Sequence, residues 1–282
     1  MTLPLSPPLK PQLALSRREL PTGPGYSYEI KLDGFRCLAF VDGAELFLQS
    51  RNGRPLGRYF PELVLPPGRY VLDGEIVVRD GAGHEDFDAL GQRIHPAASR
   101  VQRLAVETPA RYVAFDLLAR DGEALLQRPF VERRALLEKL LAGREFRRAP
   151  VELIEATADP GKARQWLLSA EGAIAKERSA PYLPGERKGM AKIKRVRTID
   201  AVVVGWRPGK ERDTVGALIL GLYGSAGEDG ELRVVGHCSG FSASEKRRLV
   251  GFLKPFQTGE RGSADPSRWS SGRELEWVAL RP

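Results

Sequence analysis

The pattern of apolar and polar positions divides the chain into a longer N-terminal part and a shorter C-terminal part. In the first 197 residues, apolar and polar side chains alternate over several short runs, which is typical of β-strands with one buried face. These runs are 26–48, which we expect to form a hairpin, and 69–79, 111–119 and 172–176. Helical spacing covers 131–141, and Asp159-Pro160 predicts the start of another helix. Residues 1–197 are therefore expected to be a mixed domain with antiparallel hairpins.

The C-terminal part, residues 198–282, is dominated by short β-rich runs. Three of them precede a capping box at Ser242-x-x-Glu245 that predicts a helix through about Leu253, and one follows it. The runs are 200–206, 216–223, 231–238 and 274–280. Short strands around one helix favour a small barrel of the oligonucleotide-binding (OB) kind, for which only four of five strands are visible. The chain as a whole is expected to be an α+β protein whose barrel is incomplete at its C-terminus.

Asp-Gly occurs six times and has two different contexts. The copies beginning at Asp42, Asp80, Asp121 and Asp229 lie near the middle or end of strand-like runs and are expected to be turns. Asp33-Gly34 and Asp73-Gly74 lie inside such runs, beside Lys31 and Glu75. A glycine inside a strand often allows another group to approach the backbone closely.

The charge balance favours a polyanionic partner. Lys plus Arg number 44 against 36 for Asp plus Glu, a net charge of +8. Cys37 and Cys238 lie in apolar runs without a CxxC motif, so we expect two buried free thiols of a reducing compartment. The three histidines have no metal-ligand spacing, and a zinc site is not expected.

The N-terminus is rich in proline and lacks the charged start and apolar core of a signal peptide. We expect it to be an extended segment on the surface of the first domain. Because the sequence holds no apolar stretch long enough to span a bilayer, a cytoplasmic protein without a membrane partner is expected.

Candidate chemistry centres on Lys31. Tyr26, Tyr28 and Ile30 alternate with polar residues along a strand. Lys31 therefore shares the polar face of that strand with Glu29. A lysine can act as a nucleophile if its surroundings favour loss of its proton. A Lys-x-Asp-Gly string alone is common, however, and is also typical of a solvated strand end. No GxxxxGK[ST] string is present, which disfavours a P-loop ATPase.

Five further stretches follow Lys31 in a suggestive order. They are Ser50-Arg51-Asn52-Gly53, Leu72-Asp73-Gly74-Glu75, Phe115-Asp116, Glu171 to Lys176, and the pair Lys192 and Lys194 on one side of a strand. These motifs, in this order, resemble those of the covalent nucleotidyltransferases, most closely the small bacterial ATP-dependent DNA ligases. The resemblance covers nearly the whole chain. It implies an adenylation domain at 1–197 and an OB-fold domain at 198–282.

The resemblance implies a reaction in three steps. Lys31 would attack the α-phosphate of ATP and retain AMP, the AMP would pass to the 5′-phosphate of a nick in double-stranded DNA, and the 3′-hydroxyl would displace it. Lys192 and Lys194 would bind the α-phosphate, and as nearby cations they would favour loss of the Lys31 proton.

The resemblance also implies roles for the other motif residues. Glu29 would contact the adenine amino group and Phe115 would stack on the base. Arg36 and Glu75 would contact ribose, Arg51 would contact phosphate or DNA, Lys176 would contact phosphate or DNA, and Glu75 with Glu171 would hold Mg²⁺ (or Mn²⁺). The alternatives are plain core packing for Phe115, a strand cap for Glu171 and a solvated surface position for Lys176. The basic run 187–197 is likewise either a phosphate contact or a solvated charge run.

The end of the chain differs from the pattern of the family that it resembles. It stops at Arg281-Pro282, where ligases of this type continue into a last strand and a basic motif that orients pyrophosphate. Arg268 and Arg273 are possible replacements, and otherwise we expect a truncated chain or slow self-adenylation. A nick-binding module with little turnover therefore stays an alternative to the DNA ligase. An RNA ligase or guanylyltransferase, which shares the Lys-x-Asp-Gly string, is a further alternative. DNA-repair proteins are possible partners.

Overall fold

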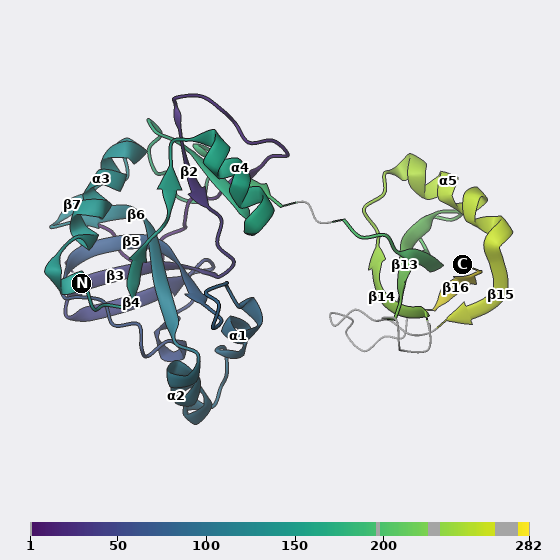
Figure 1. Cartoon of the computed structure of the whole chain (residues 1–282), viewed down its shortest axis with the longest axis horizontal. Coiled ribbons are helices and arrows are strands. Elements are labelled where there is room, and N and C mark those ends of the chain that lie inside the picture. The colour runs from purple at the N-terminus through teal and green to yellow at the C-terminus, as the bar shows by residue number, and fades with distance from the viewer. Residues whose placement is uncertain (1, 196–197, 225–231, 263–275, 282) are drawn as a thin grey trace. The chain divides into compact units, whose positions relative to one another are not determined.

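The structure is a computed structural model that describes residues 2–195, 198–224, 232–262 and 276–281. Contacts within the chain separate two compact units, Met1–Val196 and Arg197–Pro282. Figure 1 labels the helices and many of the strands. The predicted turn at Asp229-Gly230 and the basic residues Arg268 and Arg273 lie outside the described residues.

The first unit is built on two sheets. The larger has the strand order β4-β3-β5-β6-β7, with β8 parallel to β6. Its strands are β3 (Phe35–Gly43), β4 (Glu45–Ser50), β5 (Gly68–Val78), β6 (Ala110–Arg120), β7 (Glu123–Ala124) and β8 (Val151–Leu153). The second sheet has the order β1-β11-β10-β2-β9. Its strands are β1 (Leu15–Ser16), β2 (Tyr26–Ile30), β9 (Ala156–Thr157), β10 (Gly172–Glu177) and β11 (Met190–Lys194). The expected α+β class with antiparallel sheets is confirmed.

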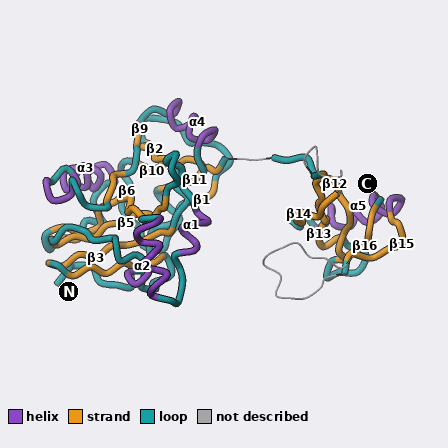
Figure 2. Tube along the Cα trace, turned by 60° about the horizontal axis from the view of Figure 1, so that its bottom comes forward, coloured by secondary structure: helices purple, strands orange, loops and turns teal. Residues whose placement is uncertain are grey.

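Helices pack on both sheets of this unit. They are α1 (Phe87–Gln92), α2 (Ala98–Glu107), α3 (Phe130–Leu141) and α4 (Pro160–Ser169), with short 3₁₀ turns at Gly57–Tyr59 and Arg144–Phe146. The Asp159 carboxylate accepts a hydrogen bond from the Gly161 amide at 2.7 Å, which caps α4 as its sequence predicts. Trp166 of α4 packs on the second sheet against Tyr28, and Figure 2 shows the helix beside those strands.

The expected hairpin over 26–48 is wrong in its pairing. β2 lies in the second sheet, whereas β3 pairs with β4 and β5 in the first. Residues 31–34 therefore carry the chain from one sheet to the other. A Cβ on Gly34 would lie 2.4 Å from the Ile76 carbonyl oxygen, and one on Gly74 would lie 2.6 Å from the Tyr112 ring. The close approach expected at both glycines is confirmed.

The N-terminal segment runs in extended form over the first unit, as expected. Leu3, Leu5 and Leu9 pack against a cluster that includes Phe40. The side chain of Gln49 holds the Leu9 backbone through two hydrogen bonds, of 3.0 and 2.6 Å. Further along, β1 pairs in parallel with β11. The segment thereby becomes an edge of the second sheet.

The second unit is a five-stranded sheet in the order β14-β13-β12-β16-β15, consistent with an OB fold. Its elements are β12 (Val202–Pro208), β13 (Val215–Tyr223), β14 (Leu232–Cys238), α5 (Ala243–Leu253), a 3₁₀ turn (Lys254–Phe256), β15 (Gln257–Gly262) and β16 (Trp277–Leu280). The capping box at Ser242 and Glu245 is present. The count of four strands is wrong, because β15 is polar and exposed and so lacks an alternating pattern. The expected C-terminal incompleteness stays a prediction.

The cysteines lie in different environments. Cys37 is buried, as expected, but Cys238 is exposed at the end of β14, so the expectation of two buried thiols is wrong for the second. Within the described ranges, no helix has the length and apolar character needed to cross a bilayer.

Candidate active site

A cavity of about 280 Å³ lies in the first unit and is lined by strands of both sheets. Nine of the ten predicted site residues line it: Glu29, Lys31, Arg36, Arg51, Glu75, Phe115, Lys176, Lys192 and Lys194. The tenth, Glu171, contacts two of these lysines. Leu13, Ala14 and Arg187 add to the lining, so the N-terminal segment forms part of the wall. The volume is near the lower end for sites that bind small ligands.

Lys31 stands where the chain leaves β2 for the larger sheet. Its ammonium lies 3.6 Å from Glu171 Oε1 and donates to the Leu32 carbonyl oxygen at 3.1 Å. Glu171 Oε1 is also 3.0 Å from Lys194 Nζ. Burial raises the pKa of the Glu171 carboxyl, but the ammonium groups of Lys194 and Lys31 outweigh it and hold that pKa below its ordinary value. Glu171 therefore does more than cap β10.

Cations gather at the same part of the cavity. Burial lowers the pKa of Lys192, and the positive charges of Lys194, Arg51, Lys31 and Arg187 lower it further. The β10–β11 register places Lys192 opposite Ile174 and Lys194 opposite Gly172. A cluster of this kind is suited to a polyphosphate, because a bound anion would relieve the repulsion among the cations.

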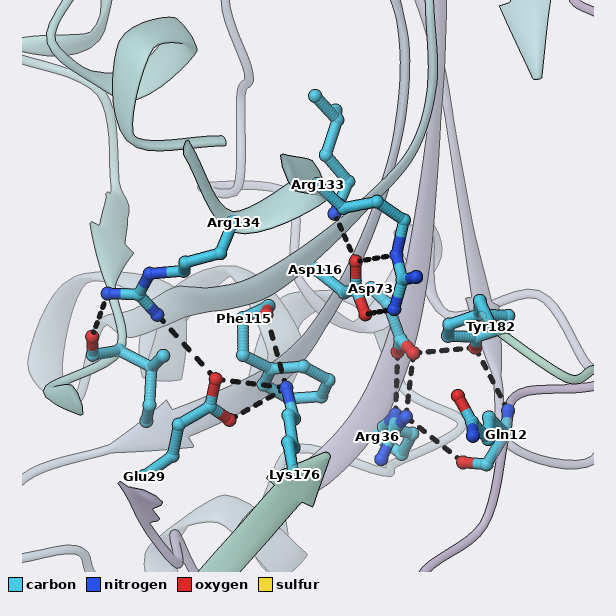
Figure 3. Close-up of polar contacts among 12 residues, drawn as sticks. Gln12, Glu29, Arg36, Asp73, Phe115, Asp116, Arg133, Arg134, Lys176 and Tyr182 are labelled. Atoms are coloured by element: carbon cyan, nitrogen blue, oxygen red, sulfur yellow. Dashed lines mark hydrogen bonds and ion pairs between the residues drawn. The ribbon is translucent and has the colours of Figure 1, made fainter. Parts of the chain in front are cut away.

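Another part of the cavity is buried and holds Glu29. This carboxylate is 2% exposed, and Lys176 Nζ lies 3.0 and 2.8 Å from its two oxygens. The same ammonium donates to the Phe115 carbonyl oxygen at 3.2 Å (Figure 3). Lys176 is 5% exposed, so the solvated surface alternative is wrong. A direct contact with DNA phosphate does not fit this burial either.

Phe115 combines core packing with exposure to the cavity. It packs against the cluster of Val77, Val113 and Ile154 and also lines the cavity. The Arg36 guanidinium carbon lies 4.5 Å from its ring centroid. Phe115 therefore offers an aromatic surface on which a base could stack.

Arg36 is held by a ring of hydrogen bonds that the sequence did not predict. Its guanidinium donates two 2.6 Å bonds to Asp73 and one of 3.2 Å to the Gln12 carbonyl oxygen. The Tyr182 hydroxyl donates to the Asp73 carboxylate at 2.6 Å and accepts from the Gln12 backbone N–H at 2.9 Å (Figure 3). Asp73 lies in the same sequence motif as Glu75, and that motif was a signal for its importance. Nothing in the sequence, however, linked Asp73 to Gln12 or Tyr182.

A second buried pair supports the same region. Asp116 and Arg133 of α3 make two hydrogen bonds of 2.8 Å. A lone carboxylate in the apolar strand β6 signals a buried partner, because an unpaired buried charge is costly. The sequence did not, however, identify the partner as Arg133.

The carboxylates of Glu75 and Glu171 could receive a divalent cation. Burial raises the pKa of Glu75 to about 7, although the charges of Arg36 and Lys31 oppose the rise. In the part of the chain that the structure describes, no group of three or more His, Cys, Asp or Glu side chains could enclose a metal by itself. Mg²⁺ usually takes one or two carboxylates together with phosphate oxygens and waters. The two carboxylates beside Lys31 therefore fit an ion that arrives with a nucleotide.

The fold and the cavity define a nucleotidyltransferase-type unit followed by an OB-type unit. Comparison with known proteins makes this more specific. The profile of the ATP dependent DNA ligase domain matches residues 12–194. DNA ligase C1 of Mycolicibacterium smegmatis is 43% identical, over all of this chain and 83% of its own length. DNA ligase C of Mycobacterium tuberculosis is also 43% identical, over all of this chain and 85% of its own.

A solved structure agrees with the sequence comparisons. Mycobacterial DNA ligase D complexed with ATP and MES superposes with a TM-score of 0.56 at 29% identity, covering 96% of this chain and 86% of that chain. The chain belongs to the family of ATP-dependent DNA ligases. The predicted family, fold and enzyme class are confirmed.

Proposed function

We propose that the chain seals nicks in double-stranded DNA through an intermediate in which Lys31 carries AMP. One observation supports this most strongly: the Lys31 amine lies 3.6 Å from Glu171, in a cavity that also holds a cluster of cations and a buried carboxylate. A nucleophile, phosphate-binding cations and a base-reading group are the parts that adenylyl transfer needs.

In the first step, the neutral Lys31 amine attacks the α-phosphorus of ATP. The N–P bond forms, the bond to the pyrophosphate oxygen breaks, and the amine loses a proton. The 5′-phosphate oxygen of the nick then attacks the same phosphorus and releases the amine. Finally the 3′-hydroxyl attacks the activated 5′-phosphate, loses its proton and expels AMP. The protein contributes mainly positioning and charge stabilisation.

Each cavity residue has its own role in binding ATP. Glu29 accepts a hydrogen bond from the adenine amino group, and Phe115 stacks on the base. Arg36 and Glu75 contact the ribose. Lys192 and Lys194 bind the α-phosphate, and Arg51 contacts the outer phosphates or the DNA backbone. Arg36 is suited to its task because Asp73 already fixes its orientation.

Glu75 and Glu171 would hold the Mg²⁺ (or Mn²⁺) ion, which would neutralise phosphate charge when bound. Glu171 must then exchange its contacts with Lys31 and Lys194 for the ion. The proposed substrate is nicked DNA, the proposed location is the bacterial cytoplasm at the nucleoid, and DNA-repair proteins are proposed partners. The net charge of +8 supports binding to a polyanion.

Sealing assays separate this function from its alternatives. With Mg²⁺ and ATP, we expect a labelled nicked DNA duplex to be sealed by the wild-type chain and by Lys162→Ala, since Lys162 is ion-paired with Glu155 outside the cavity lining. We expect no sealing by Lys31→Ala, because no other amine can replace the nucleophile. Sealing of RNA alone, or use of GTP, would identify an RNA ligase or guanylyltransferase. Nick binding by the wild type without sealing would identify a binding module.

A further inference from the structure

Glu29 is the buried polar group of the cavity whose charge has the clearest consequence for the nucleotide. Adenine carries an amino group at the position where guanine carries a carbonyl oxygen. A carboxylate accepts from the amino group and repels the carbonyl oxygen, whereas a neutral carboxylic acid can donate to that oxygen. The charge of Glu29 therefore decides which base the cavity favours.

Two cations face Glu29, from β10 and from α3. Lys176 lies 2.8 Å from one carboxylate oxygen and 3.0 Å from the other. Arg134 Nη1 lies 3.6 Å from Glu29 Oε1. Among the described residues, this buried Nη1 has no hydrogen-bond partner, while the rest of the guanidinium is held by Glu138 and the Ile154 carbonyl oxygen. Arg134 thus places a positive charge near Glu29 without forming a hydrogen bond to it.

Lys176 is held in place by Glu29 and Phe115. Its ammonium lies 4.7 Å from the Phe115 ring centroid and 4.6 Å from that of Phe130. It donates to Glu29 Oε1 and to the Phe115 carbonyl oxygen, and it forms an ion pair with Glu29 Oε2. Figure 3 shows these contacts converging on one nitrogen. Lys176 therefore acts on a bound base mainly through the carboxylate of Glu29.

We propose that Lys176 is a positioning residue that sets the preference for adenine over guanine by holding Glu29 as a charged acceptor. The inference rests on the proposed function, in which Glu29 meets the base. Burial raises the pKa of Glu29, Lys176 and then Arg134 oppose that rise, and Asp116, itself paired with Arg133, adds to it. Without the charge of Lys176, Glu29 takes up a proton at a higher pH and loses its power to reject guanine.

The test measures the lysyl adduct formed by the full chain in a single turnover with ATP or GTP, from about pH 6 to about pH 9. In the wild type we expect a strong preference for ATP throughout. In Lys176→Met the preference should fall about ten- to a hundredfold at the acid end, as expected for one lost hydrogen bond to a charged group. It should recover as the pH rises and Glu29 ionises.

Two further variants and one control sharpen the result. Glu29→Gln should lose the preference at every pH, because an amide does not titrate. Lys176→Gln, which is neutral but still polar, should behave as Lys176→Met does and replaces it if methionine prevents folding. Lys162→Met is the matched control, since Lys162 is ion-paired with Glu155 at 2.7 Å and lies 6.0 Å from the Trp166 ring centroid outside the cavity lining. Its preference should be that of the wild type.

An unchanged preference in folded Lys176→Met or Lys176→Gln at every pH would overturn the inference, as would an equal slowing with both nucleotides. Absence of any adduct on the wild-type chain would instead overturn the proposed function and, with it, this inference.

Discussion

At the scale of single residues, the cavity depends on carboxylates that are kept away from water. Glu75 is the clearest case, because its burial raises its pKa to about 7 even though Arg36 and Lys31 are near. Between about pH 4.5 and about pH 7, the folded chain therefore keeps a proton on Glu75 that the unfolded chain has already released. A site that tolerates this cost is typical of a functional carboxylate rather than a structural one.

Stability should record this cost as a dependence on pH. Because the folded-state pKa is raised, the contribution of Glu75 is fully present below about pH 4.5 and is lost as the pH rises to about 7. Glu75→Gln stays neutral, so it should exceed the wild type in free energy of unfolding by up to about 3 kcal/mol above pH 7. Urea unfolding of the first unit at several pH values measures the difference.

The exposed Glu186, which pairs with Lys188 at 2.9 Å, provides the control for this experiment. Glu186→Gln should show no comparable change between pH 5 and pH 8. If the difference between wild type and Glu75→Gln is the same at both values, the raised pKa of Glu75 is wrong.

The sequence predicted the residues that carry chemistry better than it predicted the residues that support them. Lys31, Glu29 and Glu75 stand in motifs whose order is informative. Tyr182 and Arg134 stand in no such motif, and they reach Asp73 and Glu29 only because the fold brings distant segments together. The buried position of Lys176 was also missed, since exposure is not visible in a short string.

At the scale of elements, the passage from β2 to β3 determines where the nucleophile lies. β2 ends at Ile30 and β3 begins at Phe35, in a different sheet. Lys31 therefore stands between the sheets, where strands of both contribute to the cavity. Gly34 permits the passage because its backbone lies against that of Ile76 in β5.

Alanine at position 34 should disturb this passage. Its Cβ would lie 2.4 Å from the Ile76 carbonyl oxygen, so Gly34→Ala should lower the free energy of unfolding by about 1–3 kcal/mol. It should also slow formation of the lysyl adduct by displacing Lys31. Gly91→Ala in α1 is the control, because a Cβ there meets nothing within 4 Å and alanine favours a helix. Equal stability and adduct rates in both variants would contradict this role of Gly34.

Elements were predictable where a pattern is local. β5, β6, α3 and α4 were expected close to their observed bounds, since each has a clear period or cap. The pairing of β2 was not predictable, because alternation shows that a strand has two faces but not which strand lies beside it. β15 was missed because an exposed polar strand has no apolar face to reveal it.

At the scale of the whole molecule, the two units have different proposed roles. The first contains the described cavity with the proposed nucleophile, cations and base-reading carboxylate. The second is a barrel-like sheet of a kind that often binds nucleic acid. Relatives similar along the entire chain are named DNA ligases, so both units belong to the family pattern.

The central claim is that one amine carries an adenylyl group from ATP to a broken strand, and a pulse followed by a chase tests it directly. After incubation with ATP and Mg²⁺, intact mass and peptide mapping should show one adenylyl group on Lys31, and none on the Lys31→Ala chain. Removal of ATP and addition of nicked DNA should then discharge the group and seal a matching number of nicks. An adduct on another residue, or one that nicked DNA does not discharge, would contradict the account.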